Sequence, residues 1–408
     1  MAQLLGLNIK NYRSLADVQL GQIGYGQGEP LPSLSCFIGP NGSGKSTLLD
    51  AFGFMADCLR EGAEAACDRP HRGGFARLRT QGSTAPIEFQ LYYRETPQSR
   101  PITYRFAILE EGGVPIVVME ELRQRRKGQK YGRPYPFLQL HRGRGEAWAG
   151  EATEHEEGRK KEEVLLDDRS RLGIATLGQL KEHPRIVGLR SYIESWYLSY
   201  FVPDAARVLP PAGAQKHLDR TGSNLGNVVQ YLERTHPERF QSILQRIAKR
   251  IPGIESIGHE RSPDGRLLLR FNEQGYEDPF YQQSMSDGTL KMFAYLVLLE
   301  DPEPRPFIGI EEPENGLYHK LLERLARELV QHTESARKNK PQVLVTTHSP
   351  HLVDALKPEQ VWLIEKNEEG HSQIKRTADM PSIRAMVDEG IPLGSLWYSN
   401  HLEERFSG

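Results

Sequence analysis

The sequence predicts an α/β protein whose core is a mainly parallel β-sheet covered by helices. Three short apolar segments have the length and composition of buried strands, residues 34–39, 306–312 and 342–349. Helical spacing of apolar residues marks residues 47–62, 287–300 and 318–339. Strands that alternate with helices of this length are typical of parallel sheets, because the crossover between two parallel strands needs a helix-sized connection.

The N-terminal part of the chain adds segments in which apolar and polar residues alternate. Residues 4–20 predict one or two antiparallel strands, and residues 87–93 and 102–109 alternate as half-buried strands do. Residues 110–113, Glu-Glu-Gly-Gly, are a hairpin signal before another apolar strand at 114–122. An antiparallel β subdomain is therefore expected in addition to the parallel sheet.

The middle of the chain changes character twice. Residues 123–168 are polar and charged, and a tract of helical periodicity follows at 186–200, 224–233 and 237–253. Residues 265–271 predict one more strand. We expect three parts: an N-terminal core segment, a charged insertion with a helical segment, and a C-terminal core segment, at residues 1–118, 119–222 and 223–408.

Composition limits the classes to which the chain can belong. Charged residues make up 26% and hydrophobic residues 38% of the 408 residues, as in ordinary globular proteins. The formal net charge of −2 gives no global basic field, so any contact with nucleic acid needs a local patch. Three cysteines without zinc spacing are expected to be reduced thiols of a cytoplasmic protein. The longest apolar run, residues 293–299, is too short to span a membrane.

A glycine-rich segment with the pattern G-x-x-x-x-G-K-[ST] lies between the first apolar strand and its helix. Its glycines let backbone N–H groups turn towards phosphate oxygens, and the helix adds its positive dipole end. Lys45 supplies a positive charge, and the Ser46 hydroxyl is a hard ligand for Mg²⁺. A chance turn is the alternative, which the flanking strand and helix argue against. We predict a phosphate site formed by Gly39, Pro40, Asn41, Gly42, Ser43, Gly44, Lys45, Ser46 and Thr47.

Two later apolar strands end in residues that could act on a phosphate. Glu311 and Glu312 end one strand, at the sheet edge where α/β proteins bind ligands. One carboxylate can hold Mg²⁺ and the next can orient and deprotonate water. His348 ends the other strand and could contact the γ-phosphate or the water. Each could be an ordinary solvated residue on its own, and the nearby phosphate motif is what favours function.

Four motifs in this order resemble those of the ATP-binding-cassette ATPases: GPNGSGKST, SMSDGTL, IGIEEPENGL and VTTHS. The N-terminal LNIKNYRSLADVQL is similar to the RecF/SMC/Rad50-like branch, specifically its small AAA-type proteins, which resemble the ATPase half of OLD nucleases and of phage-defence systems. The resemblance covers about residues 1–110 and 224–365 and implies a P-loop ABC-type ATPase head with an antiparallel β subdomain and a helical lobe or insertion.

The resemblance assigns a role to each matching residue. Lys45 and Ser46 fall on the Walker A lysine and Mg²⁺ ligand, and Glu311 falls on the Walker B aspartate. Glu312 falls on the catalytic glutamate, and His348 on the switch histidine. Ser286 and Gly288 match the signature serine and glycine, although Ser286 also has the ordinary pattern of a helix cap. In the family this signature covers an ATP bound to a second subunit, which implies an ATP-dependent homodimer.

Two positions depart from the family pattern. Glu311 is one methylene longer than the usual aspartate, and Asp287 replaces a signature glycine with a negative charge near the phosphate clamp. The Q-loop has two candidates, Gln81 and Gln90. The chain also lacks length for the coiled coils of SMC proteins or for the nuclease domain of OLD proteins. We therefore expect a separate effector protein.

The segment from Arg123 to Arg144 contains eight Lys or Arg residues and no Asp or Glu. Tyr131, Tyr135, Phe137 and His141 are interleaved with them. Cations that contact phosphates and aromatic rings that stack on bases suit the binding of DNA or RNA. A solvated β-hairpin whose charges keep its edge strand from aggregating explains the pattern as well.

The expected function is a Mg²⁺-dependent ATPase whose ATP-driven dimerisation controls a DNA-related process or a partner effector, as in DNA repair or anti-phage defence. A transporter-type nucleotide-binding subunit is one alternative, which the N-terminal strand pattern and stretched motif spacing disfavour. A slowly hydrolysing ATP-gated scaffold is another. No membrane contact is expected of the chain itself.

Overall fold

A computed structural model describes residues 1–25, 28–129, 131–149, 161–335 and 339–402. The chain forms two compact units. The first comprises Met1–Trp196 and Trp362–Asp379, and the second comprises Tyr197–Val361 and Met380–Gly408. Residues 119–222, which the sequence sets apart as an insertion, are thus shared between both units. Each unit has its own buried apolar core.

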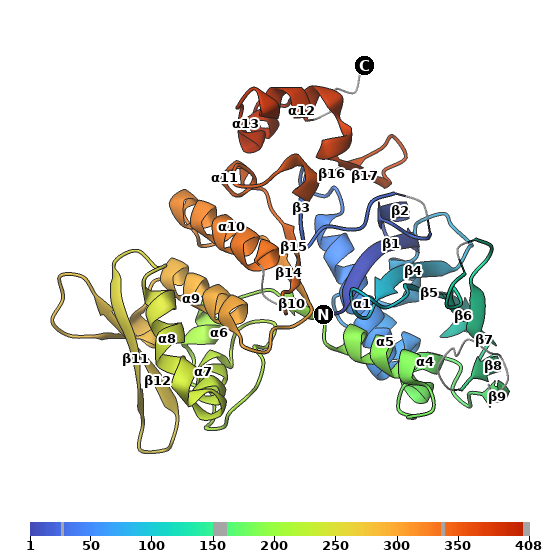
Figure 1. Cartoon of the computed structure of the whole chain (residues 1–408), viewed down its shortest axis with the longest axis horizontal. Helices are drawn as coiled ribbons and strands as arrows, with labels where there is room; N and C mark the ends of the chain where they lie inside the picture. The colour runs from blue at the N-terminus through green and yellow to red at the C-terminus, as the bar shows by residue number, and fades with distance from the viewer. Residues whose placement is uncertain (26–27, 130, 150–160, 336–338, 403–408) are drawn as a thin grey trace. The chain divides into compact units, whose positions relative to one another are not determined.

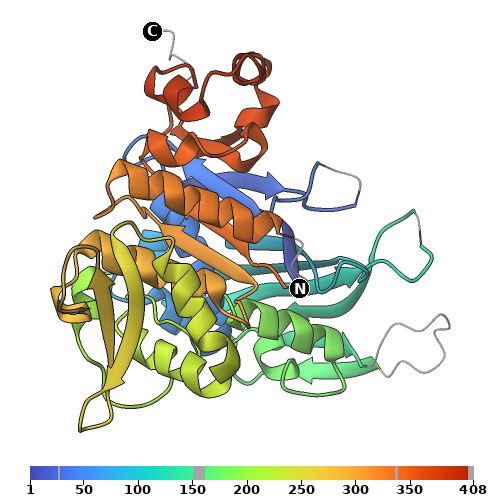
Figure 2. The same cartoon turned by 60° about the vertical axis from the view of Figure 1, so that its left-hand side comes forward.

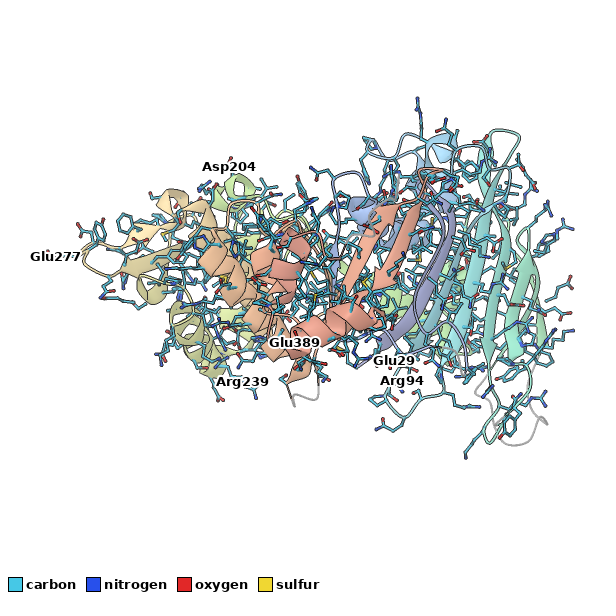
Figure 3. The ribbon with its side chains drawn as sticks, turned by 90° about the horizontal axis from the view of Figure 1, so that it is seen from above. Glu29, Arg94, Asp204, Arg239, Glu277 and Glu389 are labelled. Carbon is cyan, nitrogen blue, oxygen red and sulfur yellow. The ribbon has the colours of Figure 1, made fainter. Side chains whose placement is uncertain are left out.

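An eight-stranded antiparallel sheet forms most of the first unit (Figure 1). Its strands run in the order β2-β1-β4-β5-β6-β7-β8-β9. Period-two alternation buries one face of β4 and β5 and leaves polar side chains on the other, as the sequence predicts. Figure 3 shows the strands from above with side chains standing out from them. The bounds are Gln3–Tyr12 (β1), Leu15–Gly21 (β2), Ile87–Arg94 (β4), Ile102–Glu111 (β5), Val114–Gln124 (β6), Tyr135–His141 (β7), Arg144–Trp148 (β8) and Lys161–Leu165 (β9).

Helix α1 (Lys45–Glu61) packs on this sheet through aromatic side chains. The ring centroid of Phe54 lies 5.3 Å from that of Tyr12 and 5.8 Å from that of Phe89. Such pairs add about 1 kcal/mol each beyond the area they bury, which fixes the helix that carries the glycine-rich motif. The predicted helix at 47–62 is confirmed. The shorter helices of this unit are α2 (Ala63–Cys67), α3 (Phe75–Leu78), α4 (Gly173–Leu177) and α5 (Pro184–Glu194).

Three further strands of the first unit stand apart from the large sheet. Strand β3 (Leu34–Ile38) is buried along its whole length and leads into the glycine-rich motif. It lies beside β16 (Val361–Lys366), which pairs antiparallel with β17 (Ser372–Arg376). The predicted strand at 34–39 is therefore confirmed.

A parallel set of three strands carries the later motifs in the second unit. Strand β14 (Phe307–Glu311) pairs with β10 (Tyr197–Ser199) on one side and β15 (Gln342–Thr346) on the other. Helices α9 (Asp287–Glu300) and α10 (His319–Glu334) connect with these strands, as predicted (Figure 1). The prediction that the helix starting near 186 extends to 200 was wrong, because residues 197–199 form β10. Pairing with β14 satisfies their backbone groups there.

The second unit also contains a small antiparallel sheet with two amphipathic helices against it (Figure 2). Helices α7 (Leu225–Thr235) and α8 (Pro237–Ala248) were predicted and pack on it. The expected strand at 265–271 is confirmed as β12, but its partner β11 was not predicted. The remaining elements are α6 (Pro203–Arg207), β11 (Ile254–Arg261), β12 (Leu267–Glu273), β13 (Phe280–Tyr281), α11 (Pro350–Val353), α12 (Pro381–Asp388) and α13 (Leu393–Tyr398).

Candidate functional site

The glycine-rich loop of the first unit requires glycine at both of its ends. Gly44, which precedes α1, has φ 116°, and a Cβ atom there would lie 2.4 Å from the Ser372 Oγ. A Cβ on Gly39 would lie 2.1 Å from the carbonyl oxygen of Ile364. Any other residue at either position must move the backbone or its neighbours. The loop is thus held tightly against β16 and β17.

Lys45 and Ser46 begin α1 with different exposure. The Lys45 ammonium donates hydrogen bonds of 2.9 Å to the carbonyl oxygens of Gly39 and Pro40, and only 4% of the residue is exposed. Ser46 is exposed. No side chain caps this helix N-terminus, so its first N–H groups suit an anion. These features fit a phosphate group above the loop and a cation beside the Ser46 hydroxyl.

Two serine side chains, those of Ser372 and Ser14, hold the loop in place. The Ser372 hydroxyl donates to the carbonyl oxygen of Ser43 at 2.6 Å and to the Ser14 Oγ at 2.8 Å. The Ser372 N–H also donates to the carbonyl oxygen of Ser14 at 2.8 Å. Because these contacts come from the turn after β1 and the start of β17, segments far apart in sequence fix the loop.

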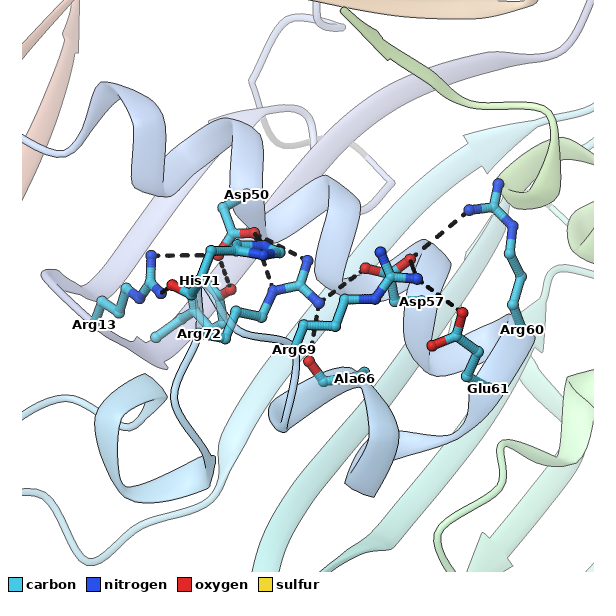
Figure 4. A network of polar contacts seen from close by, with 10 residues as sticks. Arg13, Asp50, Asp57, Arg60, Glu61, Ala66, Arg69, His71 and Arg72 are labelled. Atoms are coloured by element: carbon cyan, nitrogen blue, oxygen red, sulfur yellow. Dashed lines mark hydrogen bonds and ion pairs between the residues drawn. The ribbon is translucent and has the colours of Figure 1, made fainter. Parts of the chain in front are cut away.

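An ion-pair network holds α1 beyond its first turn (Figure 4). The Arg72 side chain, 1% exposed, donates to Asp50 at 2.9 Å and to Asp57 at 2.9 Å. The Tyr12 hydroxyl donates to Asp50 at 2.6 Å. Burial alone would raise the pKa of Asp50, but Arg72 holds it below the ordinary value. The network fixes the helix four residues beyond Ser46. Its other members are Arg13, Arg60, Glu61, Arg69 and His71.

The two predicted acids of the second unit differ in conformation. Glu311 is the last residue of β14, whereas Glu312 has left the strand with φ 40°. A glutamate rarely adopts this left-handed conformation, which costs on the order of 1 kcal/mol and is concentrated at functional sites. The Glu312 N–H donates to the carbonyl oxygen of Thr346 at 3.0 Å, and this bond ties the backbone of Glu312 to the end of β15.

The Glu312 carboxylate lies between two polar side chains. Its Oε1 lies 3.3 Å from the His348 Nε2, and its Oε2 accepts a hydrogen bond of 3.2 Å from the Asn315 side chain. The structure therefore brings Glu312 and His348 together, as the strand-end argument predicts. All three residues are partly exposed or exposed, so water can reach the carboxylate.

A third acid, Glu314, was not assigned a role from the sequence. Its carboxylate accepts hydrogen bonds from the His348 N–H and from the Thr347 hydroxyl, the latter at 2.9 Å. The signal was present, because Glu314 belongs to the same Glu-Glu-Pro-Glu-Asn motif. Its partners could not be predicted, since they lie more than thirty residues along the chain.

The segment that matches the family signature begins α9. Ser286 is the N-cap, and its hydroxyl oxygen accepts the Thr289 N–H at 3.2 Å. This is the ordinary capping role, while contact with a second nucleotide stays a prediction. Asp287 forms an ion pair with Arg207 of α6, which also donates to the Met285 carbonyl oxygen at 3.0 Å. The charge that departs from the signature pattern is thus paired with an arginine that no local motif indicates and that also pairs with Asp204.

Lys291, one turn further along α9, is also unassigned by sequence reasoning. It is 3% exposed, and its ammonium donates to the carbonyl oxygen of Asn315 at 2.7 Å. Burial lowers the pKa of Lys291 to about 8, although Glu314, Asp287 and Glu312 oppose this shift. A lysine inside an apolar helix face is the signal that could have singled it out.

The remaining predicted groups fall as follows. Among the described residues, no group of three or more His, Cys, Asp and Glu side chains is arranged to hold a metal. Mg²⁺ in ATPases takes one or two protein ligands together with phosphates and water, so Ser46 and Glu311 stay the predicted ligands.

Of the two Q-loop candidates, Gln81 lies in an exposed turn, and Gln90 on β4 donates to the Ile23 carbonyl oxygen at 2.9 Å.

The basic segment from Arg123 to Arg144 forms the hairpin between β6 and β7 and the start of β8, with residue 130 outside the described part. Phe137 is 1% exposed and cannot stack on a base, whereas Tyr131 is 86% exposed. Arg123 and Arg142 pair with Glu121 and Glu111. The exposed cations near the hairpin tip are Arg126, Lys127 and Arg133. An acidic run follows at 156–168, and of it residues 156–160 lie outside the described part.

Comparison with known proteins places the chain in a family. A family model described as "AAA domain, putative AbiEii toxin, Type IV TA system" matches residues 34–354, which is most of the chain. None of the curated proteins matches the chain. In the part that the structure describes, no helix has the length and apolar character to cross a membrane.

Two solved structures share the fold at low sequence identity. The SmcHead bound to the C-winged helix domain of ScpA is 14% identical, with 91% of this chain and 97% of that chain covered and a TM-score of 0.53. The second is the Smc head domain from Pyrococcus furiosus, with an extended coiled coil and bound to the C-terminal domain of ScpA. It is 14% identical, the match covers 95% of this chain and 100% of that chain, and the TM-score is 0.50. The chain therefore belongs to this AAA-domain family, and its fold is that of the RecF/SMC/Rad50-like ABC-type ATPase heads.

Proposed function

We propose that the chain is a Mg²⁺-dependent ATP hydrolase whose ATP-bound form is a homodimer. The observation that supports it most directly is Glu312, which is held with φ 40° and has its carboxylate 3.3 Å from the His348 Nε2. A strained acid beside a histidine at the end of a buried strand has no evident structural purpose. It suits a residue that orients and deprotonates a water molecule.

Each predicted residue then has a defined task. The loop N–H groups and Lys45 would bind the β- and γ-phosphates, and Ser46 and Glu311 would hold Mg²⁺, which would supply positive charge against the phosphates. Glu312 accepts a proton from the attacking water, and His348 donates a hydrogen bond that stabilises charge on the γ-phosphate. Catalysis comes from positioning and electrostatics, because phosphoryl transfer needs little covalent help from the protein.

The homodimer is supported by the segment that matches the signature. Asp287 carries a charge that would repel a nucleotide, but its ion pair with Arg207, which Arg207 shares with Asp204, offsets part of that charge within the same subunit. With that charge partly offset, Ser286, Gly288 and the N-terminus of α9 can contact the γ-phosphate of an ATP bound to the second subunit. ATP would then join two copies of the chain.

The closed dimer would act on a separate effector protein or on DNA or RNA, in DNA repair or anti-phage defence. The family description names a toxin of a toxin–antitoxin system, and the related Smc heads are seen with ScpA. Both are consistent with an ATPase that works through a partner in the cytoplasm. The exposed Tyr131 and the cations around it are the candidate nucleic-acid contact.

The test compares the wild-type chain with Glu312→Gln and Lys45→Ala. Wild type should release phosphate from ATP only with Mg²⁺. Glu312→Gln should bind ATP, hydrolyse it roughly a hundredfold more slowly and elute as a dimer. Lys45→Ala should lose ATP binding. The matched control for Glu312→Gln is Glu323→Gln, which changes a glutamate that is 40% exposed on α10.

Three outcomes would contradict parts of this proposal. Wild-type turnover by Glu312→Gln would exclude Glu312 as the base. ATP binding and dimerisation without turnover in the wild type would favour the ATP-gated scaffold. Purification of the native protein with a membrane subunit would favour the transporter-type alternative.

A further inference from the structure

The turn that carries Glu312 is fastened to two neighbouring elements of the second unit. It comprises residues 312–316, the first part of the segment that connects β14 to α10. Within the turn, the Asn315 N–H donates to the Glu312 carbonyl oxygen at 3.2 Å. This single bond cannot by itself hold a glutamate at φ 40°, since the left-handed conformation is disfavoured for a side chain of this kind. The contacts around the turn must therefore hold it.

Glu314 fastens the turn to the segment after β15. Its two carboxylate oxygens accept separate hydrogen bonds, from the His348 N–H and from the Thr347 hydroxyl. Thr347 is fully buried, so its bond to Glu314 is partly shielded from water, whereas Glu314 and His348 are themselves partly exposed. Glu314 therefore fixes the backbone from which His348 reaches Glu312, and one carboxylate sets the relative position of both groups.

Lys291 fastens the other side of the turn to α9. Its buried ammonium donates to the Asn315 carbonyl oxygen at 2.7 Å. The start of α9 also lies against the turn, because a Cβ on Gly288 would be 3.2 Å from the carbonyl oxygen of Gly316. A buried lysine that donates to a backbone carbonyl costs desolvation free energy, which an apolar residue would avoid. Its presence implies a use beyond filling space.

We propose that Glu314 and Lys291 are positioning residues that hold Glu312 and His348 in the arrangement needed for hydrolysis. Glu314 sets the distance between the two groups, and Lys291 transmits the position of the signature segment, residues 284–290, to the Glu312 turn. A second subunit's ATP that contacts Ser286 and Gly288 would shift α9 and thereby align Glu312. Hydrolysis would then depend on dimer closure. This inference rests on the proposed ATPase function.

The test uses three variants that retain the proposed catalytic and nucleotide-binding residues. Glu314→Ala removes both acceptors, Glu314→Gln keeps an acceptor for the His348 N–H, and Lys291→Met removes the ammonium at similar volume. The controls are Glu323→Gln and Lys249→Met, which change an α10 glutamate and an exposed lysine. For each protein, thermal unfolding, ATP affinity from a fluorescent analogue, ATP-dependent dimerisation and kcat are measured.

We expect kcat to fall by about tenfold to a hundredfold in Glu314→Ala and in Lys291→Met, with ATP affinity and dimerisation unchanged. Glu314→Gln should recover part of the loss. A loss of kcat without a loss of binding separates positioning from a general structural role.

Two results would overturn the inference. One is an active wild type whose kcat is unchanged in Glu314→Ala and Lys291→Met. The other is a loss of ATP binding, dimerisation and thermal stability in parallel with kcat, which would show that the two residues only support the fold. An inactive wild type would instead contradict the proposed function itself, so the two failures are distinguishable.

Discussion

The His348 Nε2 lies 3.3 Å from the Glu312 Oε1, and the two residues come from the ends of adjacent parallel strands. The pairing of β14 with β15 aligns Glu311 with Thr346, so the residues just beyond each strand meet. Because an imidazole at this distance can orient the carboxylate, the two side chains are expected to act as one unit.

His348→Ala should reduce kcat by about tenfold to a hundredfold while leaving ATP affinity within a few-fold of wild type. In the double variant with Glu312→Gln, the loss should be far smaller than the product of the single losses, because residues that act as a unit are not additive. The measurement is a double-mutant cycle on single-turnover rates. Losses that multiply would show that the two residues act independently.

Arg207→Ala should weaken the ATP-dependent dimer, because it leaves the Asp287 charge unbalanced beside the signature segment. Little change in unfolding free energy is expected, since a partly exposed ion pair contributes less than about 1 kcal/mol. Sedimentation in the Glu312→Gln background should show dimer affinity reduced by about threefold to tenfold. Adding Asp287→Gly should restore it, and failure to restore it would mean that Arg207 acts on the Met285 carbonyl instead.

The sequence sufficed for the residues whose roles depend on local motif and strand-end position. Lys45, Glu312 and His348 could be proposed because each comes after an apolar strand, where α/β proteins bind ligands. The antiparallel strands were likewise visible in their alternation.

What escaped prediction depends on contacts between distant segments. The three residues of β10 carry no strand signal of their own and become a strand only through pairing with β14. Arg207 lies eighty residues from Asp287, and Thr347 lies thirty-three from Glu314, so no local pattern relates them. The spacing of apolar residues predicts which face of a helix or strand is buried. It does not predict which side chain of another element that face contacts.

Gly44→Ala should abolish ATP binding, because its Cβ would lie 2.4 Å from the Ser372 Oγ at a φ of 116°. Gly42→Ala is the matched control: Gly42 has φ 75°, but its Cβ would meet no atom within 4 Å. The control carries backbone strain of about 1 kcal/mol without the clash. The measurements are the ATP affinity and the free energy of unfolding of both variants. Equal losses of ATP affinity would show that backbone strain, and not the clash with Ser372, causes the effect.

Glu120→Gln should remove a pH dependence of stability. Burial raises the pKa of Glu120 from 4.5 to about 7, although the N–H groups of Ile174 and Gly173 and the Tyr104 hydroxyl favour the charged form. The folded state therefore holds this proton more tightly than the unfolded state. Its stabilising contribution is complete below pH 4.5 and is lost as pH rises through about 7.

The measurement for Glu120 is the free energy of unfolding in urea at several pH values. Between pH 5 and pH 8, wild type should lose about 2 to 3 kcal/mol relative to Glu120→Gln, since one pKa unit corresponds to about 1.4 kcal/mol. The exposed Glu110→Gln is the control and should keep the wild-type slope. Parallel curves for wild type and Glu120→Gln would contradict the raised pKa.

The hairpin between β6 and β7 tests the nucleic-acid part of the proposal. Replacing Arg126, Lys127 and Arg133 together by alanine should weaken DNA binding at every sequence and lower the salt slope of log Kobs by about 0.7 to 0.9 for each cation that pairs with a phosphate. Tyr131→Ala should weaken single-stranded DNA more than duplex, because only unpaired bases can stack on an exposed ring. Arg142→Ala is the control, since its guanidinium is paired with Glu111 at 2.8 Å. If the triple variant binds DNA with the wild-type salt slope, the three cations do not contact phosphates and only keep the hairpin solvated. Any bound nucleic acid then contacts another surface.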